Sequence, residues 1–489
     1  MLSKNKLYTI SFAEGASVMA AEICGAKLIA PFFGSSLYVW SSVMAITLGG
    51  LACGYFIGGK LSTRQNKIKI LFFILTAAVT FLCLMPFLTS LFYLTASHLS
   101  LIPAVIISVF LLLFPTMFCM GATSPLIISI LTSKVNESGE NSGKIYAIST
   151  VGGIIATFLC GFYLIPNAGI TLTLISFAII LTLSALLLVL KKNSNNFSAT
   201  IIILPVLFAC FGFTRLSNNP FTIYKTDGIL GKLEVRDEPT ASNSSIIIRK
   251  LLINNIIQTE MNLNSKQSVS EYIHLLERNL PYFPKGKALV LGLGGGLVSN
   301  VLDDHNYKVT GVEFDKRIID MSRSFFSLKD SIKTICDDAR HFINTNNEKY
   351  NLVLFDVFKA EEQPSHIITK ESLEKLKNML DKNAVVLINT HGYLKGDRGM
   401  GTQCLLSTLK HAGFSIKICT PGENEDYRNL LIIASQIPIE ETLNNELQPI
   451  IYSNTDNVNT DNKPIIEKLN AEANQAWRKN YLHNYILFN

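Results

Sequence analysis

Residues 288–296 read Ala-Leu-Val-Leu-Gly-Leu-Gly-Gly-Gly, and residues 308–313, after a short helical pattern, read Lys-Val-Thr-Gly-Val-Glu. A short apolar run that ends in closely spaced glycines predicts a buried strand, a tight turn and a helix. Glycine lets the backbone approach a ligand that side chains would exclude. The pattern therefore predicts the first unit of a parallel α/β sheet of the Rossmann type, with a nucleotide at the turn of Gly292, Gly294 and Gly296. A purely structural turn is the alternative.

Carboxylates follow the next three predicted strands. Glu313 ends the second strand, about 20 residues after the turn, where a carboxylate can accept hydrogen bonds from both ribose hydroxyls. Asp338 follows a strand predicted at 332–336, and Asp356 follows one at 351–355. Because the carboxyl ends of parallel strands meet at one sheet edge, we expect the three side chains to face one crevice. Asp338 would equally suit the cap of the next helix.

The segments around this motif define the other domains. Residues 222–268 are strand-like with polar interruptions, which predicts a small antiparallel β domain. A helical stretch at 269–279 then leads into alternating strands and amphipathic helices, the pattern of a doubly wound sheet. We assign 269–440 to a Rossmann-like domain that binds a nucleotide, and 441–489 to a C-terminal tail.

The first part of the chain is far more apolar than the rest. Of 489 residues, 48% are hydrophobic and 16% charged, the mean hydropathy is +0.32, and the apolar excess lies before about residue 214. A membrane-spanning helix needs about 20 apolar residues, so 1–214 is predicted to be an α-helical transmembrane bundle of about six or seven helices. The first apolar run is too long for a signal peptide and lacks a cleavage site. The predicted spans are 7–33, 37–62, 69–95, 100–130, 144–165, 169–190 and a shorter seventh at 198–214.

Charged loop residues predict the orientation in the cell (inner) membrane. Lys and Arg follow the second, fourth and sixth spans, whereas the alternate loops carry none. By the positive-inside rule the N-terminus is cytoplasmic. Six spans would keep the C-terminal half in the cytoplasm, and seven would place it outside. The shortness of the seventh segment and the free cysteines favour the cytoplasm.

Two features inside the spans are unusual. Gly50, Gly54 and Gly58 recur every four residues, which predicts one helix face that packs closely against a neighbour, with a ligand role as the alternative. Glu22 and Lys27 lie within the first span, where ionisable side chains are costly. They predict either an internal ion pair or an acidic site for a cationic substrate. Glu14 lies nearer the start of this span, and we expect its side chain to extend to the membrane boundary.

Charge and cysteine content exclude other classes. The formal net charge is +6, but the basic residues are scattered without a basic and aromatic stripe, so nucleic acid is not expected as a partner. Nine cysteines without regular spacing argue against a disulfide framework and against a metal site.

The soluble half resembles a known family. In chain order, Glu313, Asp338-Ala-Arg340 and Asp356 resemble the spermidine synthase family, which transfers an aminopropyl group from decarboxylated S-adenosylmethionine to a polyamine. Leu252-Ile-Asn-Asn-Ile-Ile-Gln258, followed by Glu271-Tyr-Ile-His274, resembles the substrate-gating segment of that family. This resemblance covers roughly 222–435.

The membrane half is similar to the multi-pass spermidine synthase-like proteins, which fuse a helical membrane domain to a synthase-like domain. The residues that carry this similarity are Glu22, Phe33 to Ser36, Gly54, Gly58 to Leu61, Pro115, Met120 to Thr123, Pro125, Tyr146, Ala147 and Thr150. Pro364, His366, Thr369, Thr460 to Asn462 and Pro464 add to it in the other half.

The resemblance implies roles for individual residues. Glu313 would hold the ribose and Asp338 the adenine amino group. The co-substrate would be decarboxylated S-adenosylmethionine or S-adenosylmethionine itself, with no metal. The partners would be a small-molecule amine and the lipid bilayer, and a homodimer is one option for the assembly.

On the substrate side, Gln258, Tyr272 and His274 would border the sulfur and the amine, and Asp356 would lie beside the transferred group. Tyr272 and Asp356 are therefore candidate catalytic residues.

This chain also departs from the family pattern. Typical synthases carry an Asp where this chain has Gly295, and a second Asp where it has Lys359. The second carboxylate accepts the proton of the attacking amine, and a charged lysine cannot do so. Glu361 is the predicted replacement base, and a solvated loop residue is the alternative for it. The leading hypothesis is a membrane-anchored aminopropyltransferase-like enzyme. The alternatives are an S-adenosylmethionine-dependent methyltransferase and a non-catalytic transporter or sensor that binds an adenosyl ligand.

Overall fold

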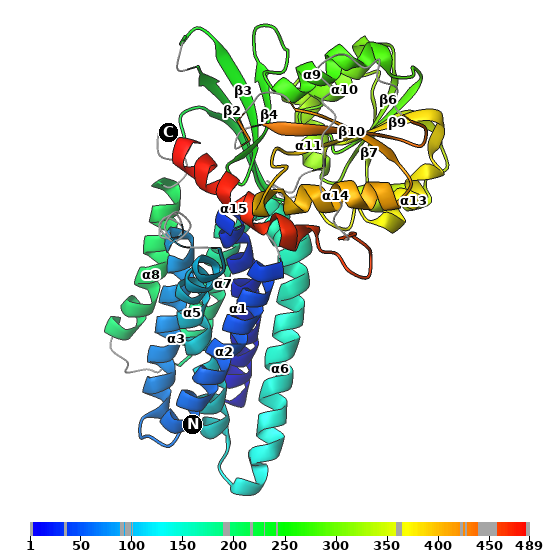
Figure 1. Ribbon diagram of the computed structural model, residues 1–489. Helices are drawn as coiled ribbons and strands as arrows, with labels where there is room; N and C mark the ends of the chain where they lie inside the picture. The colour runs from blue at the N-terminus through cyan, green and yellow to red at the C-terminus, as the bar shows by residue number, and fades with distance from the viewer. Residues whose placement is uncertain are drawn as a thin grey trace. The chain divides into compact units, whose positions relative to one another are not determined.

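The computed structural model forms two compact units (Figure 1). The helical unit comprises Met1–Pro220 and Thr226–Lys232, and the α/β unit comprises Phe221–Lys225 and Leu233–Asn489. The residues that the structure describes are 3–33, 37–88, 92, 99, 101–188, 196–215, 219–228, 230–240, 243–357, 364–420, 424–425, 428–438 and 457–485.

The helical unit has a helix at each position where a span was predicted. These helices are α1 (Lys4–Phe33), α2 (Leu37–Leu61), α3 (Lys67–Leu84), α5 (Leu101–Leu131), α6 (Ser138–Leu159), α7 (Ile165–Leu186) and α8 (Asn196–Arg215). A π-helical turn, Cys160–Leu164, joins α6 to α7, and the backbone breaks from helical geometry at Gly169. Helix α6 packs against α1, whereas α7 packs against both α1 and α3.

The number of helices suited to crossing a membrane is smaller than the predicted six or seven. Within the described part of the chain, four helical segments are long and apolar enough, and they are Tyr38–Leu61, Lys67–Leu88, Ile102–Leu131 and Val135–Leu186. The last holds two predicted spans in one run of 52 residues. Charged side chains lower the hydropathy of α1, and the apolar part of α8, Thr200–Gly212, is too short. The prediction of an apolar helical bundle is confirmed with this corrected count.

The glycines of α2 pack directly against α5, as the four-residue spacing predicts. A Cβ atom added to Gly54 would lie 2.4 Å from the carbonyl oxygen of Phe118. One added to Gly58 would lie 2.5 Å from the carbonyl oxygen of Ala122. Gly50 is similarly close to α5, because its Cβ would lie 2.8 Å from Cβ of Met117. Only a hydrogen atom fits at these positions, so the two helix backbones approach closely.

The acidic residues of α1 differ from the expectation in one respect. Glu14 is 2% exposed and its Oε2 accepts a hydrogen bond of 3.1 Å from the Ser149 hydroxyl of α6, so it does not reach outward to a boundary. Gly15 lies against the backbone of Ser149, which brings α6 close enough to cover Glu14. Glu22 and Lys27 are half-buried. Five positions place them about 140° apart around the helix, which disfavours an ion pair between them.

The chain after α8 forms two sheets. The smaller has the order β1-β2-β3-β4, in which β2, β3 and β4 pair antiparallel. The larger has the order β10-β11-β9-β8-β5-β6-β7, with β5 to β9 parallel and β10 and β11 antiparallel. The small sheet is formed by β1 (Thr222–Gly228), β2 (Gly231–Pro239), β3 (Ile247–Ile253) and β4 (Ile256–Asn262). The predicted antiparallel sheet and Rossmann-like sheet are both present.

The larger sheet alternates with helices along the chain. Its strands are β5 (Lys287–Leu291), β6 (Lys308–Glu313), β7 (Lys333–Cys336), β8 (Tyr350–Phe355), β9 (Leu380–His391), β10 (Ser415–Cys419) and β11 (Asn429–Ser435). The helices of this unit are α9 (Glu271–Asn279), α10 (Leu297–Asp304), α11 (Lys316–Phe325), α12 (Ala339–Thr345), α13 (Lys370–Lys377), α14 (Met400–His411) and α15 (Ile466–Tyr485). Helix α15 lies in the segment predicted as a tail, and its Ile466 belongs to the buried core of the unit.

We expect Gly58→Ala to destabilise the helical unit by about 1–3 kcal/mol, because the new methyl group would press against the backbone of α5. Gly59→Ala is the matched control, since no atom lies within 4 Å of its added Cβ. Alanine favours a helix over glycine, so the control should be neutral or stabilising. Thermal unfolding of both variants in detergent measures the difference. Equal midpoints for the two would show that α2 and α5 are not in close contact.

Candidate active site

The glycine turn after β5 touches the end of β8. Gly292 has a φ of +86°, and a Cβ atom there would lie 2.3 Å from the carbonyl oxygen of Asp356. Hydrogen bonds from the Asp356 amide to the Leu291 carbonyl and from the Gly292 amide to the Val312 carbonyl, each 2.8 Å, fix the three strand ends together. The predicted nucleotide turn and the predicted catalytic carboxylate are therefore neighbours.

Glu313 supports the turn. Its Oε2 accepts a hydrogen bond from the Leu293 amide and its Oε1 one from the Asp315 amide, each 3.0 Å long. The side chain is 7% exposed, and burial raises its pKa above the usual range despite these backbone bonds. Each oxygen retains a lone pair, so the carboxyl can accept ribose hydroxyls while it holds the backbone.

Asp356 is held by two neutral donors. The Tyr272 hydroxyl of α9 donates to its Oδ2 at 2.8 Å, and Nδ2 of Asn389 in β9 donates to its Oδ1 at 2.7 Å. Asn389 in turn accepts a bond of 2.9 Å from Nδ2 of Asn429 in β11. Burial raises the pKa of Asp356, while both donors favour the ionised form. Burial and the carboxylate raise the pKa of Tyr272 well above its usual value, so Tyr272 remains a donor.

Asp338 caps helix α12, as its alternative interpretation predicts. Its Oδ1 accepts the amides of Arg340 at 2.9 Å and His341 at 3.0 Å. Its Oδ2 lies 3.7 Å from Nε2 of His366. The cap uses one oxygen, so the other can still accept a bond from a ligand.

The remaining candidates lie around this centre. Nε2 of Gln258 on β4 is 3.4 Å from the carbonyl oxygens of Ile256 and Ile257. Tyr272 points to Asp356, whereas His274, two positions further along α9, lies about 160° away around the helix. The predicted base Glu361 and its neighbour Lys359 lie outside the described residues.

Gly295 is tightly enclosed. Its amide donates to Oγ1 of Thr259 at 2.8 Å. A Cβ atom there would lie 2.6 Å from Cγ2 of Thr259 and 3.0 Å from Cδ1 of Phe326. The turn therefore leaves no room for the Asp that typical synthases carry at this position.

Sequence reasoning missed Thr259, Asn389 and Asn429. Thr259 directly follows Gln258, so the matched segment could have suggested it. Asn389 directly follows the apolar run 384–388 of β9, near the carboxyl end of the strand, which is a signal for a polar group at the ligand edge. Nothing in the sequence indicates that Asn429 would reach Asn389.

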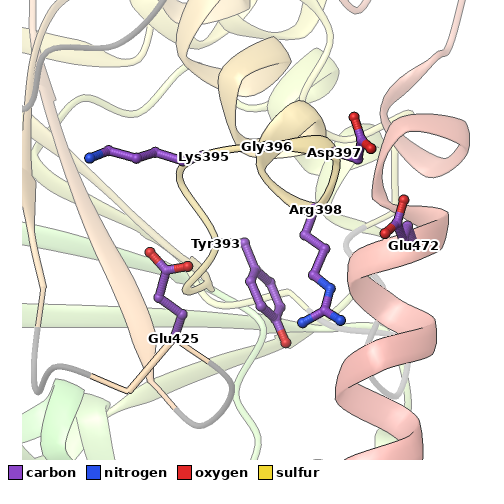
Figure 2. A pocket seen from close by; sticks show the side chains of 7 residues that line it. All are labelled: Tyr393, Lys395, Gly396, Asp397, Arg398, Glu425 and Glu472. Carbon is purple, nitrogen blue, oxygen red and sulfur yellow. The ribbon is translucent and has the colours of Figure 1, made fainter.

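Strand β9 runs parallel to β8 and ends at the same edge of the sheet. The residues that follow β9 line a cavity of about 400 Å³. Figure 2 shows Arg398 beside the ring of Tyr393, with Glu472 projecting from α15. The cavity is lined by Tyr393, Lys395, Gly396, Asp397, Arg398, Glu425 and Glu472. Among the described residues, no cluster of three or more His, Cys, Asp or Glu is arranged to hold a metal ion.

The sequence matches one family model and several curated proteins. Residues 273–399 match the family model described as the spermine/spermidine synthase domain. Polyamine aminopropyltransferase 2 of Aquifex aeolicus is 23% identical over 424 residues, which cover 82% of each chain. The matched part of this chain is longer than the α/β unit, so the match extends into the helical unit.

Two further proteins match shorter parts. Polyamine aminopropyltransferase of Vibrio vulnificus is 30% identical over 127 residues, 24% of this chain and 42% of that protein. The crystal structure of spermidine synthase from Thermotoga maritima aligns with 15% identity and a TM-score of 0.35, covering 51% of this chain and 88% of that one.

We expect Gly295→Asp to destabilise the α/β unit by about 1–3 kcal/mol, because the side chain would overlap Thr259 and Phe326. Gly295→Ala should show a smaller loss, and adding Thr259→Ser should recover part of it, since serine lacks the obstructing methyl group but keeps the hydroxyl. Thermal unfolding of the three variants tests this. If Gly295→Asp unfolds like the wild type, the turn is not closed at this position.

Proposed function

We propose, on the premise that this chain is a transferase with a spermine/spermidine synthase domain, that it is a membrane-bound aminopropyltransferase. It would transfer the aminopropyl group of decarboxylated S-adenosylmethionine to a polyamine or another amine. The observation that carries the proposal is the Asp356 carboxylate, held by Tyr272 and Asn389 directly beside the glycine turn that Glu313 supports.

The proposed reaction is a displacement at carbon. The lone pair of a neutral amine attacks the carbon next to the sulfonium, a C–N bond forms, the C–S bond breaks with its electrons going to sulfur, and methylthioadenosine leaves. The amine nitrogen loses one proton to a base. Because the sulfonium is already a good leaving group, the protein contributes mainly alignment and placement of charge.

The site residues divide between the two substrates. Glu313 would accept the ribose hydroxyls and Asp338, through Oδ2, the adenine amino group. The backbone turn of Gly292, Gly294 and Gly296 would allow the close approach of the nucleoside.

On the amine side, Asp356 would orient the attacking nitrogen, with Tyr272 fixing the carboxylate. Gln258 and His274 would border the sulfur and the amine. Glu361 is the proposed base, because Lys359 replaces the usual carboxylate and cannot accept a proton while charged.

The membrane placement is part of the proposal. Four described segments are long and apolar enough to cross a bilayer. We propose a multi-pass protein of the cell (inner) membrane with a cytoplasmic N-terminus and the α/β unit in the cytoplasm, where the co-substrate is made. A homodimer is compatible with this arrangement.

One observation favours methyl transfer as a second candidate. The closed space at Gly295 excludes a carboxylate that would repel the carboxylate of intact S-adenosylmethionine. Both reactions would use Glu313 and the glycine turn, and they differ in the group that leaves sulfur.

Product analysis distinguishes the two reactions. The full-length protein, incubated with decarboxylated S-adenosylmethionine and a panel of amines, should release methylthioadenosine, and Asp356→Asn should lower this rate. Release of S-adenosylhomocysteine from S-adenosylmethionine would instead support methyl transfer. If neither product forms above background, the chain is not a transferase of this type.

Glu361→Gln should reduce methylthioadenosine release by about 10²–10⁴-fold, the usual contribution of a general base. Glu362→Gln is the matched control in the next position and should retain activity. Lys359→Asp should raise turnover if the lysine has replaced the base. Wild-type activity in Glu361→Gln would remove Glu361 from the mechanism.

We expect Tyr272→Phe to shift the pH dependence of turnover. The Tyr272 bond favours ionised Asp356, so its loss raises the pKa of Asp356 further above its usual value. The carboxylate is then protonated at higher pH, and the acid limb of kcat/KM should move to higher pH. Tyr282→Phe, at an exposed tyrosine of the same unit, should leave the profile unchanged. An unshifted limb in Tyr272→Phe would mean that Asp356 does not govern it.

A further inference from the structure

The C-terminal segment 457–485, which ends in α15 (Figure 1), contacts the rest of the α/β unit at two separate places. One contact lies beside helix α12, which Asp338 caps. The other lies at the turn between β3 and β4, the strand that carries Thr259. Both contacts are therefore adjacent to elements of the proposed nucleotide site.

The first contact begins with Asn459, which is fully buried. Its Nδ2 donates to the carbonyl oxygens of Ser365 and Ile368, each at 2.8 Å, and its Oδ1 accepts the Ile465 amide at 2.9 Å. These bonds fix the segment that contains His366 to the C-terminal residues.

Asp461 extends this contact to α12. Its Oδ2 accepts a bond of 2.7 Å from Nη2 of Arg340, and its Oδ1 accepts one of 2.6 Å from the Thr369 hydroxyl. Nη1 of Arg340 also donates to Oγ1 of Thr369 at 2.7 Å and to the His366 carbonyl at 3.1 Å. Since Arg340 lies two residues after Asp338, Asp461 holds the first turn of α12 against the segment that carries His366.

The second contact is made by aromatic residues of α15. The ring of Trp477 lies 5.2 Å from that of His391, at the end of β9, and 5.0 Å from that of Tyr481. The Tyr481 hydroxyl donates to the Asn255 carbonyl at 2.9 Å and accepts the Ile257 amide at 3.0 Å. It therefore bridges the turn that leads into β4.

Strand β4 continues this second contact to the glycine turn. Thr259 lies two residues after Ile257 and accepts the Gly295 amide. Tyr481 is thus connected to the glycine turn in three steps. Its hydroxyl binds the Ile257 amide, β4 runs from Ile257 to Thr259, and Thr259 binds the Gly295 amide.

We propose that residues 457–485 form a clamp that positions the nucleotide site from both sides, with Asp461 acting through Arg340 and Asp338, and Tyr481 acting through β4 and Thr259. Neither residue contacts the ligand, so both are positioning residues. The inference rests on the nucleotide site of the proposed function and adds the C-terminal segment to it.

The test measures the affinity of the detergent-solubilised full-length chain for methylthioadenosine by calorimetry. Asp461→Asn and Tyr481→Phe should each weaken binding by about 2- to 30-fold, the range for positions that modulate a distant site. Asp461→Glu, which keeps the charge, should bind more tightly than Asp461→Asn. The matched controls are Asp330→Asn and Tyr282→Phe, both at exposed side chains of the same unit.

Hydrogen exchange separates the two sides of the clamp. Asp461→Asn should speed exchange in 364–370 and the start of α12, and Tyr481→Phe in 255–259. Unchanged affinity in both variants, even with lowered thermal stability, would overturn the clamp and leave the proposed function intact. If the wild-type chain fails to bind methylthioadenosine, the proposed nucleotide site and the clamp are both wrong.

Discussion

The approach of Gly292 to the backbone of Asp356 is the constraint on which the site depends. Parallel pairing of β5 with β8 places Leu291 opposite Phe355, so the residues that follow each strand must share one small space. A Cβ atom at position 292 would lie 2.3 Å from the Asp356 carbonyl oxygen, so only glycine fits without movement. The turn that would receive a nucleoside and the carboxylate that would orient an amine are thereby fixed next to each other by the backbone itself.

The two central carboxylates are held by neutral groups. Backbone amides bind Glu313, and Tyr272 and Asn389 bind Asp356, and neither carboxylate forms a salt bridge with another described residue. Elsewhere in this unit carboxylates pair with cations, as Asp237 does with Arg249. Burial without a cation raises the pKa of both Glu313 and Asp356. A bound sulfonium or ammonium would supply the missing positive charge and favour their ionised forms.

The sequence was sufficient for features that depend on local patterns. The glycine turn, the strands that end at Glu313 and Asp356, and the glycine face of α2 all follow from spacing and hydropathy. The contact of Asn429 with Asn389 could not be predicted, because antiparallel pairing of β11 with β9 depends on the whole sheet. The burial of Glu14 was missed for a similar reason, since it requires the close approach of α1 and α6 at Gly15. The number of membrane-suited helices was overestimated because one charged and one short segment were counted with the apolar ones, and because two predicted spans form one helical run.

The departures of this chain from typical synthases concern charge rather than fold. At position 295 the neighbouring Thr259 and Phe326 fill the space that an aspartate side chain would need. The surroundings of this position are therefore suited to glycine. At position 359 a lysine stands where typical synthases carry an aspartate, so the charge there is positive instead of negative. Glu313, Asp338 and Asp356 are suited to hold an adenosyl sulfonium in either aminopropyl or methyl transfer, and so they cannot decide between the two. The choice depends on which carbon bonded to sulfur lies in line with the attacking nitrogen, the first carbon of the aminopropyl group or the methyl carbon. In both reactions this nitrogen must first lose a proton, because an ammonium ion has no lone pair with which to attack carbon.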